Sequence, residues 1–132
     1  MRNRTYILAS ALILGIAGSA GASSEPSLSR YKECLFQVSV YGSIVSTLRD
    51  QGHEIDFNEV ERAHNFVDFL VTYGINEYGA KKAKVVSEEI GGPLWMNRAR
   101  ELGKMFARDG IETGIARMDV RIRECEVIWD QS

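Results

Sequence analysis

The stretch YKECLFQVSVYGSIVSTL, residues 31 to 48, carries apolar residues at alternating steps of three and four positions. That spacing places them along one side of an α-helix, as in the seams where two helices pack together. The residues of this seam are Tyr31, Cys34, Val38, Tyr41, Val45 and Leu48. The sequence therefore predicts a helix that starts near Pro26, ends at about Asp50 and buries one continuous stripe.

A matching seam lies at the other end of the chain. Read backwards, residues 111 to 129 have the same alternating spacing at Trp129, Cys125, Ile122, Met118, Ile115 and Ile111. When the two seams are aligned antiparallel, the residue numbers of each facing pair add to a nearly constant value. Two antiparallel helices in register meet that condition, and both seams then place their cysteine at the same level. The first and last helices are thus predicted to be antiparallel neighbours.

The only two cysteines, Cys34 and Cys125, fit a structural disulfide better than the alternatives. A redox pair of the common kind has two residues between its cysteines, as in Cys-x-x-Cys. A structural zinc ion needs four ligands, and His53 and His64 are not placed to converge with both cysteines. An even number of cysteines in an exported chain favours a disulfide. We therefore predict a Cys34–Cys125 bond.

Residues 1 to 22 have the pattern of a secretory signal peptide. Two arginines precede an apolar run, and Ala20-Gly21-Ala22 provides the small residues that signal peptidase accepts. An uncleaved membrane anchor is the alternative, but the run is shorter than the ~20 residues of a spanning helix. We predict cleavage after Ala22, a periplasmic or secreted product, and a single helical domain over residues 23–132 with no membrane span of its own.

The remaining helix boundaries are marked by caps and glycines. Asp56 is a predicted N-cap, and Glu59, three positions on, would complete a capping box. This second helix should reach at least Tyr78, and a favourable pair of Glu77 with the lysine four positions on could carry it across Gly79 to Ile90.

Further along, glycine and proline in the sequence Gly91-Gly92-Pro93 predict the end of one helix and the start of the next. A third helix is expected over Leu94 to Arg108, and the last over Glu112 to Trp129. No alternating strand pattern occurs. The expected fold is all-α: a small antiparallel bundle of four helices, or five if the second is divided, with the first and last joined by the disulfide.

Charge is mildly acidic overall and segregated along the chain. There are 16 basic and 18 acidic side chains, and removal of the two arginines in residues 1–22 leaves a net charge of −4. That balance argues against nucleic-acid binding, which favours a basic surface. Residues 50–79 contain seven acids against Arg62 alone, whereas residues 80–108 contain seven bases against three acids. Either neighbouring helices neutralise one another, or an acidic face attracts a cationic partner.

Glu61, His64 and Asp68 are the candidate metal ligands, because Glu-x-x-His places both side chains on one helical face. Di-metal four-helix proteins use this motif twice, and it occurs here once. A surface histidine beside solvated carboxylates is the simpler interpretation. The sequence also lacks the Cys-x-x-Cys-His motif of covalent haem attachment, and no cofactor is expected. No grouping of nucleophile, base and oxyanion donors predicts catalysis.

The second helix is apolar on more than one face. Phe66, Phe69 and Tyr73 form a row displaced around the axis from a separate valine stripe. The row is either core in a helix buried on two sides, or an exposed patch for a partner or a dimer mate. With Glu59 and Glu61, these aromatic residues are the candidate partner-binding residues.

These observations predict a small exported helical protein that binds another protein and is not an enzyme. An inhibitor or immunity-type protein, or an envelope-stress binder in the periplasm, would have such a size and compartment. The alternative from another class is a metal- or haem-binding bundle centred on His64. The sequence does not identify the partner.

Overall fold

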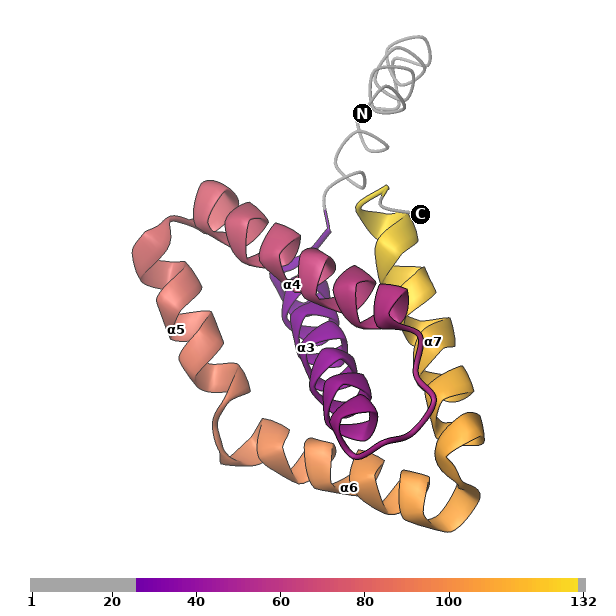
Figure 1. Cartoon of the computed structure of the whole chain (residues 1–132). Helices are drawn as coiled ribbons and strands as arrows, with labels where there is room; N and C mark the ends of the chain where they lie inside the picture. The colour runs from indigo at the N-terminus through magenta and orange to yellow at the C-terminus, as the bar shows by residue number, and fades with distance from the viewer. Residues whose placement is uncertain (1–25, 131–132) are drawn as a thin grey trace, which may run out of the picture.

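The computed structural model describes residues 26–130, which form five α-helices (Figure 1). The helices are α3 (Leu28–Asp50), α4 (Phe57–Tyr78), α5 (Ala80–Ile90), α6 (Pro93–Asp109) and α7 (Ile111–Ile128). No strand occurs in this part of the chain. The predicted all-α fold is confirmed, with five helices because the predicted second helix is divided. The predicted signal peptide at residues 1–22 lies outside the described residues.

Helix α3 lies at the centre of the arrangement. In Figure 1, α4, α5, α6 and α7 follow one another around it, and each contacts the next. α3 itself packs on α4, α5 and α7. The core follows from this topology, because the central helix is covered on several sides: α3 contains nine buried residues, whereas α6 at the edge contains none.

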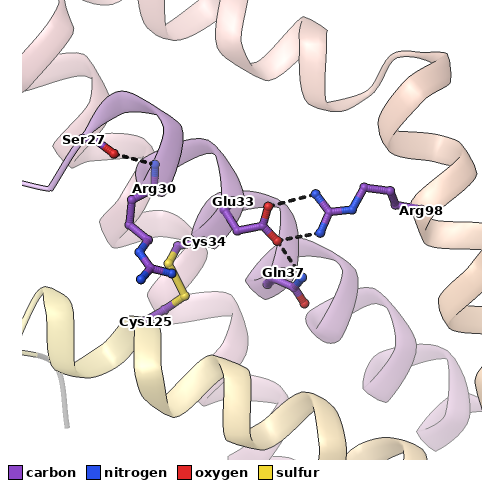
Figure 2. The surroundings of a disulfide bond; sticks show 7 residues. All are labelled: Ser27, Arg30, Glu33, Cys34, Gln37, Arg98 and Cys125. Atoms are coloured by element: carbon purple, nitrogen blue, oxygen red, sulfur yellow. Dashed lines mark hydrogen bonds and ion pairs between the residues drawn. A yellow bond between two sulfur atoms is a disulfide. The ribbon is translucent and has the colours of Figure 1, made fainter.

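The predicted seam between the first and last helices is present. Figure 1 shows α3 and α7 running in opposite directions, and Figure 2 shows the Cys34–Cys125 disulfide between them. The Cα atoms of the two cysteines are 5.8 Å apart, within the usual range for a bridge. Seam positions near the disulfide are almost fully buried, and burial decreases towards Leu48 and Ile111 at the far end.

Close contact between α3 and α4 depends on Gly74. The Tyr31 side chain of α3 lies against this glycine, and its hydroxyl donates a hydrogen bond of 2.7 Å to the Leu70 carbonyl oxygen. A Cβ atom at position 74 would lie 2.1 Å from that hydroxyl oxygen. Only glycine therefore lets the tyrosine reach the α4 backbone.

Side-chain caps and one glycine define the start and end of the first two helices. Ser27 accepts a hydrogen bond from the Arg30 backbone N–H, and the predicted N-cap Asp56 accepts one from the Asn58 N–H. The Glu59 side chain does not complete a capping box; it accepts from two other side chains described below. Gly79 has φ 91°, a conformation that favours glycine, and it ends α4. The sequence left open whether the helix continues through Gly79, and the structure divides it there into α4 and α5.

The other predicted boundaries agree with the structure to within a residue or two. α5 ends at Ile90 and α6 begins at Pro93, as the Gly-Gly-Pro sequence indicated. Within residues 26–130, no helix combines the length and the apolar character that crossing a membrane requires.

Candidate functional site

A charged network centred on Arg62 joins α4 to α7. The Arg62 guanidinium binds the Glu126 carboxylate through two hydrogen bonds, of 2.8 and 2.9 Å, and Asp119 through one of 2.9 Å. It also donates to Glu59 one turn earlier on α4. The Glu126 side chain is only 8% exposed. A buried carboxylate of this kind needs a positive partner, and Arg62 supplies it.

Tyr41 of α3 extends this network into the core. Its hydroxyl donates a hydrogen bond of 2.9 Å to Glu59. Burial, followed by that bond to the carboxylate, raises the pKa of Tyr41 well above its usual value. The bond to Glu126 raises the pKa of Arg62 despite partial burial. Because the guanidinium already donates to three carboxylates, the network acts as a brace between helices.

The pKa of Asp119 is affected by two opposing influences. Burial alone would raise it, but hydrogen bonds from Arg123 and Arg62 hold it below the ordinary value of 3.8. The Asp119 carboxylate is therefore ionised in the folded protein at neutral pH. Sequence reasoning did not find this network, because its members lie on different helices and only Glu59 and Arg62 show helical spacing.

A second polar cluster ties α6 to the central helix, as Figure 2 shows in part. Arg98 binds both oxygens of Glu33, at 2.9 and 2.6 Å, and Gln37 donates to the same carboxylate. The bond from Arg98 lowers the pKa of Glu33. The guanidinium also lies over the rings of Phe36 and Trp95, at 4.7 and 4.8 Å from their centres. These contacts attach a helix that has no buried residue of its own.

The structure brings Ser46 and His64 together, which the sequence pattern did not indicate. The Ser46 hydroxyl oxygen lies 3.4 Å from the His64 Nε2 atom. A serine nucleophile needs a base that is held by a third group, and oxyanion donors nearby. Across residues 26–130, no hydrogen bond joins the other His64 nitrogen to a carboxylate. Both residues lie within helices, where backbone N–H groups are already bonded, so the pair lacks the parts of a hydrolytic site.

The candidate metal ligands are exposed on α4. Glu61, His64 and Asp68 share one side of the helix. In the part of the chain that the structure describes, no group of three or more His, Cys, Asp or Glu side chains is arranged to hold a metal ion.

The aromatic row of α4 packs largely inward. Phe66 is 4% exposed, and Phe69 and Tyr73 are partly buried against the core. Tyr73 lies among the rings of Tyr31, Tyr78 and Trp129. This placement matches a helix buried on two sides and leaves Phe66 inaccessible to a partner. Of the five candidate binding residues, Glu61 alone is exposed, since Glu59 is partly buried in the Arg62 network.

A different surface of α4 is open. We call it the exposed α4 face, and it consists of Phe57, Glu61, His64, Asp68, Val71 and Ile75. Three of these are apolar side chains with 49%, 38% and 44% of their surface exposed: Phe57, Val71 and Ile75. Val71 and Ile75 lie one turn apart, whereas Glu61, His64 and Asp68 separate them from Phe57.

The acids around this face have few partners within the protein. Six of the seven acids in residues 50–79 are exposed: Asp50, Glu54, Asp56, Glu61, Asp68 and Glu77. Within the described chain, the one ion pair that any acid of this segment makes is that of Glu59 with Arg62. The bases of residues 80–108 that form ion pairs bind Glu33, Glu101 and Asp109 instead. Ion pairs therefore do not join the acidic segment to the basic one.

A shallow groove of about 350 Å³ separates α6 from α7. Leu102, Met105 and Met118 supply apolar surface, and Arg117, Arg121 and Glu124 surround it. Arg117 is already paired with Asp109. The groove thus combines a small apolar floor with charges of both signs.

No family model, no curated protein and no solved structure matches this chain.

Proposed function

We propose that this chain is an exported, non-enzymatic domain that binds another protein at the exposed α4 face. Two features support export: the signal-peptide pattern at residues 1–22 and the disulfide between Cys34 and Cys125. Disulfides of this kind persist in oxidising compartments such as the periplasm and the extracellular space. The bond joins α3 to α7, and α4 packs on α3.

The observation that carries the proposal is the uncompensated acidic charge beside exposed apolar residues of α4. Glu61 and Asp68 lie within the exposed α4 face, and Glu54 and Asp56 precede it. None of these four carboxylates forms an ion pair inside residues 26–130. Such a surface attracts a cationic protein over a distance and then buries apolar side chains on contact. Inhibition of a basic toxin or hydrolase, and envelope-stress binding, are two forms of this function.

Site-specific photo-crosslinking in cells of the source organism tests the proposal. A photoreactive amino acid replaces Glu61 or Asp68 on α4, and Glu112 on α7 serves as the matched control. Glu112 is also an exposed acid without an ion pair in the described chain, and it lies outside the groove between α6 and α7. We expect protein adducts from the two α4 positions and none from α7. Adducts that form equally from all three positions, or none from α4, would refute the docking face.

The electrostatic part is tested with the purified adduct partner, identified by mass spectrometry. Raising the salt concentration from about 0.05 to 0.5 M shortens the Debye length several-fold. The dissociation constant should therefore rise about tenfold or more. An affinity that does not change with salt would remove charge as the reason for docking.

A further inference from the structure

The exposed α4 face has the spacing of a packing seam. Phe57, Glu61, His64, Asp68, Val71 and Ile75 follow one another at steps of four, three, four, three and four positions. This is the alternation that also places the buried seams of α3 and α7 side by side. On α4 this alternation appears on side chains that remain exposed. Two of them also contact α3, since Arg49 lies over the Phe57 ring and Ser46 lies 3.4 Å from His64 Nε2. α4 packs on its own core with its buried side, which contains Val60, Leu70 and Gly74, and its exposed side is able to pack on another helix.

We infer that the exposed α4 face binds the same face of a second copy of this chain, with the two α4 helices antiparallel. In that orientation the stripe of one copy aligns residue by residue with the stripe of the other. Phe57 faces Ile75 of the second copy, Glu61 faces Val71, and His64 faces Asp68, so that every facing pair has the same sum of residue numbers. A two-fold axis then generates each contact twice, as an isologous interface requires.

The His64–Asp68 pair at the centre of the stripe determines how the two α4 helices are oriented relative to each other. An imidazole ring donates a hydrogen bond to a carboxylate, and the two-fold axis creates two such His64–Asp68 contacts. A parallel arrangement would instead place His64 against His64 and Asp68 against Asp68. Like charges that face each other destabilise an interface, so the antiparallel orientation is favoured.

Charge beyond the stripe supports the same orientation. The antiparallel pairing brings the N-terminal end of one α4, with Glu54 and Asp56, beside the C-terminal end of the other. There α5 begins with the exposed bases Lys81, Lys82 and Lys84, which outnumber the one neighbouring acid, Glu77. None of these lysines forms an ion pair within residues 26–130. The unpaired acidic and basic segments of one chain thus neutralise each other across the two-fold axis.

The size of the face predicts a weak dimer. The 18 steps from Phe57 to Ile75 cover about 27 Å of helix at 1.5 Å per residue. A single helix pair of this length buries less area than a standard protein interface, and such small interfaces are transient. The inference rests on the proposed function, because it names an occupant of the same face. A cationic partner would have to displace the second copy.

Sedimentation velocity on the processed, oxidised chain tests the dimer, over about 5 to 500 µM because the interface is small. We expect the average mass to rise from monomer to dimer across this range. His64→Asp places two acids opposite each other twice and should raise the dissociation constant at least tenfold. Asn65→Asp is the matched control: it adds the same charge at the adjacent exposed position, about 100° around the helix. That variant should dimerise like the original chain.

A second substitution that restores dimerisation would show that residues 64 and 68 face each other. In the double variant His64→Asp with Asp68→Lys, the new carboxylate of each copy faces the new ammonium group of the other. Dimerisation should then return to within about threefold of the original. Circular dichroism of every variant checks that the helices remain folded.

Three outcomes would overturn the inference: a chain that stays monomeric over the whole range, a dimer indifferent to His64→Asp, or no restoration by the double variant. If the chain is monomeric but α4 crosslinks to a different protein, the second copy is the wrong occupant and the docking face stands.

Discussion

Replacement of Gly74 by alanine should destabilise the contact between α3 and α4. Helix propensity alone predicts the opposite effect. Alanine is the better helix former by about 1 kcal/mol, so on an exposed helix the change would stabilise. Here the new Cβ atom would lie 2.1 Å from the Tyr31 hydroxyl oxygen and 2.8 Å from its Cζ atom. Tyr31 is 1% exposed and packs against Tyr73, Tyr78 and Trp129. It has no free space into which to move.

The expected magnitude follows from three contributions. Overpacking a filled core costs about 1 to 3 kcal/mol. Displacing the tyrosine also breaks its hydrogen bond to the Leu70 carbonyl, which contributes about 1 kcal/mol. After the gain of about 1 kcal/mol in helix propensity, the net loss is about 2 kcal/mol. For a domain of this size, that lowers the melting temperature by roughly 10 °C.

Urea unfolding of the oxidised protein, followed by circular dichroism, measures the free energy of unfolding. Gly103→Ala on α6 is the control, because a Cβ atom there meets nothing within 4 Å. It should stabilise by up to about 1 kcal/mol. Adding Tyr31→Phe to the Gly74→Ala variant removes the closest clashing atom, so the two changes should cost less together than the sum of their separate effects. The reasoning is refuted if Gly74→Ala and Gly103→Ala stabilise the protein alike.

Three further predictions concern the disulfide and the charged network. Replacing Cys34 and Cys125 with serine should lower the free energy of unfolding by about 3 to 5 kcal/mol, since the bond closes a long loop. If reduction of the original chain leaves its melting temperature unchanged, the disulfide does not stabilise the fold in this way. Arg62→Met leaves the Glu126 carboxylate buried without its partner and should cost about 3 kcal/mol in urea unfolding, whereas Glu126→Gln combined with it should recover part of the loss. Because the folded state lowers the pKa of Asp119, this carboxylate contributes stability above pH 3.8 that is lost as the pH falls through the folded-state pKa. Acid titration monitored by circular dichroism should show that Arg62→Met loses less stability on acidification than the original chain does.

Sequence reasoning was most successful where one local pattern repeats over many residues. The antiparallel seams of α3 and α7 were predicted from the spacing of apolar positions, and the position of the disulfide followed from the two cysteines at one level. Caps and breaks were also readable, because Asp56 and Gly91-Gly92-Pro93 act on the backbone of their immediate neighbours. Whether α4 ends at Tyr78 or continues was left open, because a glycine inside a helical pattern permits either continuation or a turn. The φ of 91° at Gly79 selects the turn.

The amino-acid sequence by itself determined that this protein is helical, that its first and last predicted helices pack antiparallel, and that a disulfide joins them. Periodicity encodes those features, since the side of a helix on which a residue lies depends only on its position. The tertiary structure alone decided which side of α4 is buried and which is open. It also decided that Arg62 meets Asp119 and Glu126, and that Phe66 belongs to the core. These outcomes depend on how helices cross, and crossing is set by close contacts such as Tyr31 on Gly74 rather than by any pattern within one helix.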